Sequence, residues 1–303
     1  MSINKRYVII LLVVGLLVVF GILALNPAID GQRNVAFNSE RAMEDVVYQV
    51  SLGSRTPGSP AHTQVQQYIL SELDKAGWTA EIISAQYGGQ TVENIIAKQR
   101  PDSHPGVILG AHYDTRLTAD RDPDPGKRNL PVPGANDGAS GVAVLLELSR
   151  SLGENSGDEI WLVFFDAEDN GKIPGWDWIL GSRSFVEDLD VQPGAAVIVD
   201  MVGDADLNLY YEKKSDAQLS QQIWEQAAKL GYGEVFIPQA KHAIIDDHVP
   251  FLEAGIPAVD IIDIDYPYWH TTADTVDKIA PASLQAVGDT LQAWLENSSP
   301  LAK

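Results

Sequence analysis

The chain has 303 residues, of which 45% are hydrophobic and 21% are charged; it has no cysteine and a net charge of −21. The absence of cysteine excludes disulfides, thiolate metal sites and thiol nucleophiles. A chain this acidic is repelled by phosphate backbones, which argues against nucleic acid as a partner. Apolar content is ordinary and Gly and Pro are scattered, so collagen-like, coiled-coil and disordered classes are excluded as well.

The N-terminal segment is unusual because residues 7–25, YVIILLVVGLLVVFGILAL, carry no charge. A helix over this run would span roughly 28 Å, close to the thickness of a hydrocarbon core. Lys5 and Arg6 precede the run and no base follows until Arg33, so the positive-inside rule predicts a cytoplasmic N-terminus at residues 1–6. We expect a transmembrane signal-anchor at 7–25. A cleaved signal peptide, which would give a secreted protein, is the alternative, and a buried core helix is the third interpretation.

The remainder is then expected to be extracytoplasmic, with a tether at residues 26–37 and one domain at 38–303. Its apolar runs at 107–111, 160–165 and 195–199 are short and continuous, as in buried central strands, and 258–262 resembles them but is interrupted by Asp260. Helical patterns occupy 60–77, 138–152, 216–230 and 281–296, and 79–87 with 91–97 are predicted to pair as a hairpin. This alternation predicts an α/β domain with a central, mostly parallel, twisted sheet flanked by helices on both faces.

Unusual polar residues follow the predicted strands, at the edge where α/β sheets bind ligands. His112 ends the first strand, Glu168 and Asp169 follow the second, and Asp200 follows the third. Asp114 is two residues beyond His112, where it could accept the second ring N–H. The other candidates come from loops: Asp137 opens a helix, Asp246 precedes an apolar stretch, and Trp269 and His270 follow the last strand. Two histidines with several carboxylates suit Zn²⁺.

Each of these residues also has a purely structural interpretation. Asp137 and Asp246 could cap helices, a lone histidine at a strand end is usually only hydrogen-bonded, and Glu168 with Asp169 could form an exposed turn. Trp176 and Trp178 could be packing residues of a surface loop. These interpretations weaken together, because independent caps and turns need not all fall at strand ends. The long irregular stretch at 115–133 is also more typical of a functional loop than of an incidental one.

The motifs at these positions resemble those of the zinc-dependent peptidase family M28. They are GAHYDTR, GANDGASGVAVLLELSR, FFDAED, LGSRSF, DMVG and WHTTADT, and GSRTPGSPAH resembles the N-terminal segment of the family. Within the family, the long loop after Asp114, the segment DDHVPFLEAGIPAVDII and the WHT triplet resemble the bacterial glutaminyl cyclases. The resemblance covers about residues 50–295 in a consistent order, and it implies that 38–303 is a catalytic domain.

The resemblance implies that Asp137, Asp169 and His270 ligate zinc and that Glu168 is the general acid/base. His112 and Asp200 match further metal ligands of two-zinc aminopeptidases, whereas these positions do not bind metal in the one-zinc cyclases. Asp246 matches a cyclase carboxylate near the catalytic glutamate, and Trp269 matches a tryptophan of the substrate pocket. Many relatives have Glu where this chain has Asp169, and Trp176 and Trp178 cannot be assigned because loop lengths differ.

Two enzymatic functions follow from the resemblance. The first is a glutaminyl-peptide cyclotransferase, which converts an N-terminal glutamine of a peptide to pyroglutamate with release of ammonia and holds one Zn²⁺. The second is an aminopeptidase with two Zn²⁺ that hydrolyses the first peptide bond. A non-catalytic binding module is the third possibility, although none of the expected ligands is missing. In both enzymatic cases the substrates are peptide or protein N-termini; the oligomeric state is not predicted.

Overall fold

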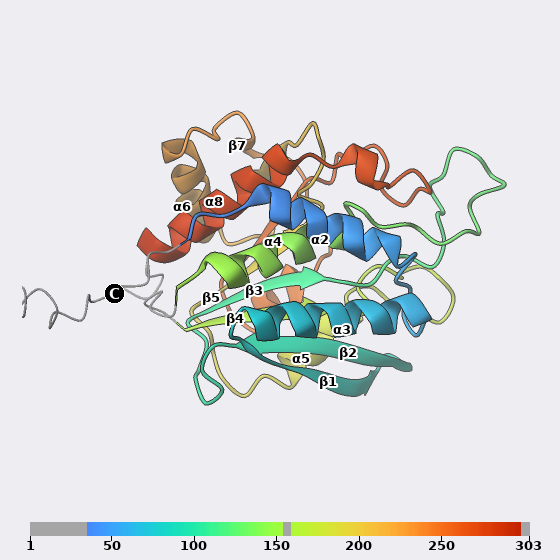
Figure 1. The fold of residues 1–303 in the computed structure, drawn as a ribbon, viewed down its shortest axis with the longest axis horizontal. Helices are drawn as coiled ribbons and strands as arrows, with labels where there is room; N and C mark the ends of the chain where they lie inside the picture. Colours follow the sequence, from blue (N-terminus) through green and yellow to red (C-terminus); the bar gives the residue numbers. More distant parts are fainter. Residues whose placement is uncertain (1–34, 154–158, 298–303) are drawn as a thin grey trace, which may run out of the picture. The chain divides into compact units, whose positions relative to one another are not determined.

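The computed structural model describes residues 35–153 and 159–297, and a six-stranded sheet forms the centre of this part of the chain (Figure 1). The strand order is β1–β2–β4–β3–β5–β8. The pairs β4–β3, β3–β5 and β5–β8 are parallel, whereas β1–β2 and β2–β4 are antiparallel. The strands are β1 Thr79–Tyr87, β2 Gln90–Lys98, β3 Val107–His112, β4 Ile160–Phe165, β5 Ala195–Asp200 and β8 Ala258–Ile262.

The central strands are mostly apolar because both faces of the sheet are covered. Alternate residues of β3 illustrate this: Val107, Leu109 and Ala111 belong to one hydrophobic cluster, and Ile108 belongs to the other. The first cluster includes residues of α2, α3, α4, α6 and α8, and the second includes residues of α5 and α7. The prediction of a mostly parallel sheet between two helical layers is therefore confirmed in the described residues.

Most predicted elements are present close to their expected bounds. The helices are α2 Ser39–Ser51, α3 Pro60–Lys75, α4 Ala139–Ser151, α5 Leu180–Glu187, α6 Ala217–Lys229, α7 His248–Glu253 and α8 Pro281–Asn297. The predicted hairpin is β1 and β2. The sequence analysis missed α2, α5 and α7, and it missed a small parallel pair formed by β6 Leu209–Tyr211 and β7 Phe236–Ala240.

The first described residues already pack into the helical layer that contains α2. α2 packs on α4 and α8, and the three helices run side by side in Figure 1. Phe37, which we placed in the tether, is 4% exposed, and a Cβ at Gly288 of α8 would lie 2.3 Å from its ring. Phe37 N also donates to the side chain of Gln292. Residues just before α2 are thus packed against the C-terminal helix.

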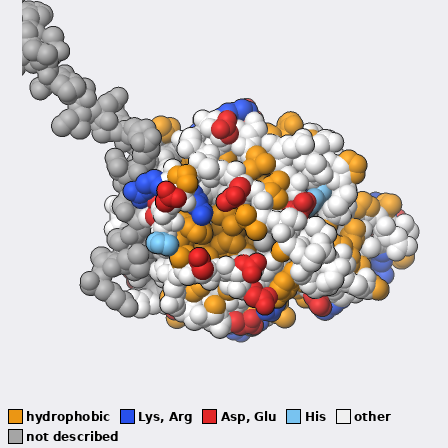
Figure 2. Space-filling view, turned by 90° about the horizontal axis from the view of Figure 1, so that it is seen from below, with side chains coloured by type: hydrophobic (Ala, Val, Ile, Leu, Met, Phe, Trp, Pro, Cys, Tyr) orange, Lys and Arg blue, Asp and Glu red, His pale blue; other side chains and the backbone are white. Residues whose placement is uncertain are grey.

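The opposite side of the sheet carries a shallow groove. It has a volume of about 250 Å³ and is lined by residues of β1, β2 and α5, which lie low in Figure 1. Figure 2 views the molecule from below and shows hydrophobic side chains gathered in a hollow bordered by acidic ones. None of the residues that we predicted to be catalytic or metal-binding lines this groove.

The predicted membrane-anchored location is corrected here. Among residues 35–153 and 159–297, no helix is both long enough and apolar enough to cross a membrane. The expected anchor, residues 7–25, lies outside the described residues, as do residues 1–6 and most of the expected tether. Contact with a membrane through an N-terminal helix is therefore withdrawn.

Candidate metal centre and active site

Three of the predicted zinc ligands come together in the described structure. Asp137 lies in the loop before α4, Asp169 follows β4, and His270 lies in the loop after β8. His270 Nε2 is 2.8 Å from Asp169 Oδ1 and 3.9 Å from Asp137 Oδ2. One potential ligand atom from each residue lies within 4.8 Å of the others, and all three residues are buried. A histidine and two carboxylates that converge in this way could hold a metal ion.

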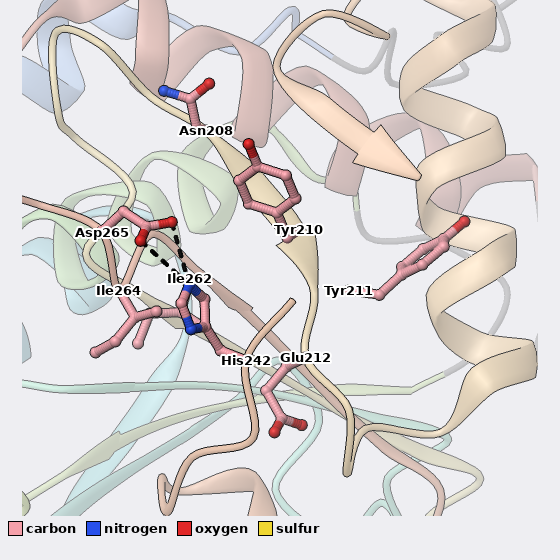
Figure 3. Close-up of a pocket in the computed structure, with 8 residues that line it drawn as sticks. All are labelled: Asn208, Tyr210, Tyr211, Glu212, His242, Ile262, Ile264 and Asp265. Atoms are coloured by element: carbon pink, nitrogen blue, oxygen red, sulfur yellow. Dashed lines mark hydrogen bonds and ion pairs between the residues drawn. The ribbon is translucent and has the colours of Figure 1, made fainter. Parts of the chain in front are cut away.

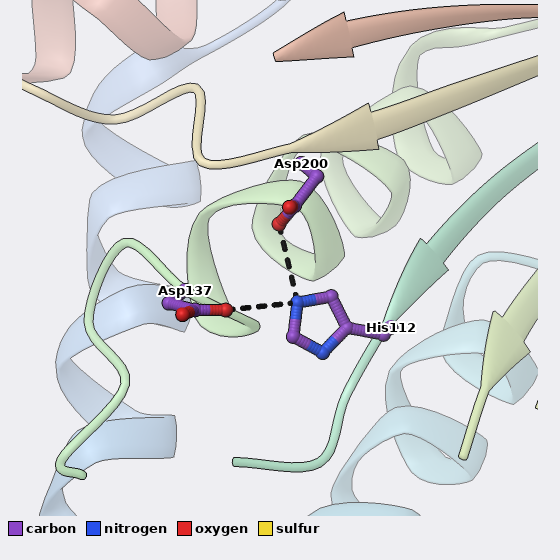
Figure 4. Close-up of side chains that lie close together, drawn as sticks. All are labelled: His112, Asp137 and Asp200. Atoms are coloured by element: carbon purple, nitrogen blue, oxygen red, sulfur yellow. Dashed lines mark hydrogen bonds and ion pairs between the residues drawn. The ribbon is translucent and has the colours of Figure 1, made fainter. Parts of the chain in front are cut away.

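His112 and Asp200 lie beside this group. His112 Nε2 is 3.1 Å from Asp200 Oδ1 and 3.2 Å from Asp137 Oδ1, so the ring points between the two carboxylates (Figure 4). Asp137 therefore belongs to both clusters. The expected bond from His112 Nδ1 to Asp114 is long, at 3.5 Å, and lacks good hydrogen-bond geometry.

Several buried polar atoms of these clusters have no protein partner. They include Oδ2 of Asp137, Oδ2 of Asp169 and Nδ1 of His112. A buried carboxylate oxygen without a donor is costly, and a bound cation removes that cost. Burial, followed by repulsion from Asp137, raises the pKa of Asp169 to about 6. The site therefore holds more negative charge than its own side chains neutralise.

Glu168 and Asp246 are two further buried acids. Both line the pocket that also contains Asp137 and Asp169. Burial, followed by repulsion from Asp246, raises the pKa of Glu168 well above its usual range. Burial, followed by repulsion from Asp200, does the same to the pKa of Asp246. Two buried acids with raised pKa values in one pocket are candidates for acid–base chemistry.

Polar contacts fix the loops that carry these side chains. Asp114 accepts from Glu168 N at 3.0 Å, and Asp274 accepts from Asp137 N at 3.2 Å. Arg116 donates through Nη1 to the backbone oxygen of Asp169 at 2.7 Å. These contacts tie the segment after β3 to the loop after β4, and the segment before α4 to the loop after β8. The potential ligand atoms are therefore pre-positioned by interactions from outside the group of Asp137, Asp169 and His270.

The backbone is also strained at the site. Ala167, Met201 and His270 have φ values of 53°, 45° and 57°, in the left-handed region that non-glycine residues seldom occupy. Ala167 precedes Glu168, and Met201 follows Asp200. Such conformations persist where the surrounding structure enforces them, and they concentrate at functional sites.

The acids open into a pocket of about 330 Å³. Two tryptophans, Trp178 and Trp269, stand on its wall with an apolar stretch that includes Ile244 and Ile245. The Trp178 ring stacks on His270 with centroids 6.0 Å apart, and the Arg116 guanidinium lies 5.0 Å from its centre. Trp176 instead packs on a small cluster with Val92, Ala167 and Leu180. The two tryptophans that the sequence left unassigned are thus separated: one lines the pocket and the other packs beneath it.

The family of this chain is shown by a match between its sequence and a family model. A model of peptidase family M28 matches residues 94–295, about two thirds of the chain. The chain belongs to peptidase family M28. This match contains all of the predicted site residues, from His112 to His270.

Individual known proteins are similar to this chain over two thirds or more of its length. Aminopeptidase YwaD of Bacillus subtilis is 32% identical over 232 residues, which are 68% of this chain and 45% of that protein. The chain thus spans about half the length of this relative. The structure of Tannerella forsythia glutaminyl cyclase has a TM-score of 0.81 at 33% identity, covering 87% of this chain and 100% of that one. A Zn-dependent exopeptidase from Parabacteroides distasonis has a TM-score of 0.82 at 33% identity, covering 87% and 99%.

Sequence reasoning missed the residues that hold the ligands in place. Arg116 and Asp274 stand in the quoted motifs, but their partners are distant in the chain. Arg55, in the segment GSRTPGSPAH, is completely buried and donates to the backbone oxygen of Gly134 at 2.6 Å. The only signal in the sequence was an arginine between Gly53 and Pro57, in the motif that resembles the N-terminal segment of the family.

Proposed function

We propose that this protein is a zinc-dependent glutaminyl-peptide cyclotransferase whose catalytic domain comprises residues 38–303. The observation that carries the proposal is the pairing of Glu168 with Asp246 on the wall of a pocket that also contains Asp137 and Asp169. The similarity to the Tannerella forsythia cyclase, over the full length of that chain, supports it.

The residues present fit a zinc ion. Asp137, Asp169 and His270 would hold it, because one imidazole and two carboxylates are a common zinc donor set, and because unpartnered carboxylate oxygens lie in the cluster. When bound there, Zn²⁺ would supply Lewis-acid stabilisation of negative charge on the γ-carboxamide oxygen of the substrate.

The chemistry assigned to the chain's own residues is proton transfer. The α-amine of an N-terminal glutamine attacks its own γ-carboxamide carbon, so that a ring C–N bond forms, the C–NH₂ bond breaks and ammonia leaves. Glu168 accepts the proton from the attacking amine and returns it to the leaving nitrogen. Asp246, beside Glu168, helps to retain that proton between the two carboxylates, and Asp200 completes the acidic surroundings.

The pocket walls account for the shape of the proposed substrate. Trp269 and Trp178 would enclose the folded glutamine side chain, which must curl back on its own amine. Holding this conformation gives the intramolecular reaction its advantage. Peptide and protein N-termini are therefore the proposed substrates.

A di-zinc aminopeptidase is the second candidate. One observation favours it: His112, Asp137 and Asp200 form another buried group whose ligand atoms lie within 4.8 Å of one another. In that case Glu168 would deprotonate the water that attacks the first peptide bond. Zinc content separates the candidates, since we expect one zinc per chain for the cyclase and two for the aminopeptidase.

The function is tested by ammonia release. Incubation with a peptide that begins with glutamine should release one ammonia per peptide. The same peptide with an acetylated α-amine should release none, because it lacks the nucleophile. Equal ammonia release from both peptides, or release from neither, would contradict the cyclase.

A further inference from the structure

Behind Asp246 lies a second group of buried ionisable residues that the proposed reaction does not use. Glu212, His248 and Asp260 are 4%, 0% and 0% exposed. His248 Nε2 is 3.2 Å from Glu212 Oε2, and His248 Nδ1 is 3.5 Å from Asp260 Oδ2. Atoms of Asp246, His248 and Asp260 lie within 4.8 Å of one another. The histidine thus stands between two carboxylates, with Asp246 close by.

Glu212 is firmly held as an anion. Its Oε2 accepts from the backbone N–H groups of Lys214 and Ser215 at 2.8 and 2.7 Å. Burial alone would raise the pKa of Glu212, but contact with His248 and backbone hydrogen bonds lower it to about 2. Asp260 is the opposite case, since burial and repulsion from Asp246 raise its pKa well above the usual range.

The two carboxylates face opposite nitrogens of the same ring. His248 Nε2 lies toward Glu212 and His248 Nδ1 toward Asp260, but neither ring nitrogen makes a contact with good hydrogen-bond geometry. The acids therefore hold the ring between them by packing and charge in a fully buried cluster.

Glu212 contacts the chain on both sides of Asp246. Its Oε1 accepts from Ile244 N at 3.0 Å, and its Oε2 faces His248. Ile244 and His248 are each two residues from Asp246, and Ile244 and Asp246 both line the pocket. One buried carboxylate therefore contacts both ends of the segment 244–248, which presents Asp246 to the pocket.

We propose that Glu212 and His248 are positioning residues that hold Asp246 at the correct place beside Glu168; this rests on the proposed function. Neither residue lines the pocket that contains Glu168, so they act through Asp246 rather than on the substrate. A metal ion held by Asp246, His248 and Asp260 is the competing explanation of the same cluster. Complete burial of His248 and Asp260 and the absence of both from this pocket's lining favour the positioning role.

The test compares His248→Leu, which removes both polar ring contacts, with His248→Gln, whose polar amide can still lie between Glu212 and Asp260. The matched control is His242→Gln. His242 lies near Glu212 but pairs with Asp265 at 3.1 Å, and the Glu212 carboxylate points away from it (Figure 3). All proteins are used as zinc-loaded full chains, and cyclisation of a glutamine-initiated peptide is followed.

We expect His248→Leu to lower kcat by about 100-fold, the loss typical of a displaced catalytic group, with KM within about twofold of wild type. His248→Gln should recover at least about a tenth of wild-type kcat, and His242→Gln should match wild type. Zinc content should be unchanged. If His248→Leu does not fold, Glu212→Gln should show the same fall in kcat.

Three results would overturn the proposal. They are wild-type kcat in folded His248→Leu or Glu212→Gln, a change confined to KM, and a zinc ion present in wild type but lost in His248→Leu. Failure of the wild-type protein to cyclise the peptide would contradict the proposed function instead. In that case the ratios of variant to wild-type kcat are measured on an aminopeptidase substrate, so that the positioning role is still tested. A crystal structure of His248→Leu provides a readout without substrate, in which Asp246 should be displaced from Glu168.

Discussion

His270 Nε2 lies 2.8 Å from Asp169 Oδ1, although 101 residues separate them in the chain. The contact joins the loop after β8 to the loop after β4, across the carboxyl edge of the sheet. Asp137 approaches the same point from the start of α4, so three distant segments converge on a volume that suits one cation.

Metal affinity should depend on these three side chains and on the residue that supports His270. Asp169→Asn removes a proposed ligand charge and should abolish stoichiometric zinc binding. Asp120 Oδ1 is 3.3 Å from His270 Nδ1, so Asp120→Asn should weaken zinc binding by about 10- to 100-fold. Elemental analysis and competition with a chelator measure both. The exposed Asp277→Asn is the control, and unchanged zinc affinity in Asp169→Asn would contradict the assignment.

Glu168→Gln separates proton transfer from metal binding. Glutamine has nearly the same shape as glutamate but cannot accept the amine proton, so turnover should fall by about 10²- to 10⁴-fold. Zinc content should stay at the wild-type level, because Glu168 is not a proposed ligand. Glu253→Gln, on the outer surface of α7, should be fully active. Substantial turnover by Glu168→Gln would exclude Glu168 as the acid/base.

The dependence of the free energy of unfolding on pH in the acid range should report the ionisation of Glu212. Its pKa falls from 4.5 to about 2 on folding, so its ionised form stabilises the fold above about pH 4.5, and this contribution is lost as pH decreases toward 2. When Glu212 is fully ionised, this contribution to the free energy of unfolding is about 3 kcal/mol. Urea unfolding of wild type and Glu212→Gln should therefore give free energies that converge as pH falls through this window. A difference that stays constant with pH would contradict the depressed pKa.

The approach of α4 to β5 should tolerate no added methyl group. A Cβ at Gly141 would lie 2.1 Å from the backbone oxygen of Val199, next to Asp200. Gly141→Ala should cost about 1–3 kcal/mol or more through overpacking. Gly233→Ala is the matched control, because no heavy atom lies within 4 Å of a Cβ there. Thermal unfolding compares them, and equal melting temperatures would show that the helix can shift without cost.

The sheet could be predicted because burial on both faces leaves a continuous apolar run, as in 160–165. Polar residues that follow such runs, Asp169 among them, were expected to converge at one edge, whereas the grouping of Asp137, Asp169 and His270 was implied by the resemblance to family M28. The short helices α5 and α7 were missed because six to eight residues hold too little periodicity to distinguish a helix from a loop.

The supporting residues could not be derived in the same way. Arg116 and Asp274 act through backbone atoms that are remote in the chain, and no local pattern encodes such a contact. Asp260 did leave a signal, since it interrupts an otherwise apolar strand. That signal had no visible partner until the fold placed His248 and Glu212 beside it.

The most direct test of the account is mass spectrometry of a glutamine-initiated peptide after incubation with the zinc-loaded protein. The predicted product is 17 Da lighter, about the mass of one ammonia, and otherwise has its full length, because ring closure at the terminal glutamine proceeds with Glu168 as the proton carrier. A peptide shortened by its first residue, with free glutamine in solution, would contradict the cyclase and identify an aminopeptidase.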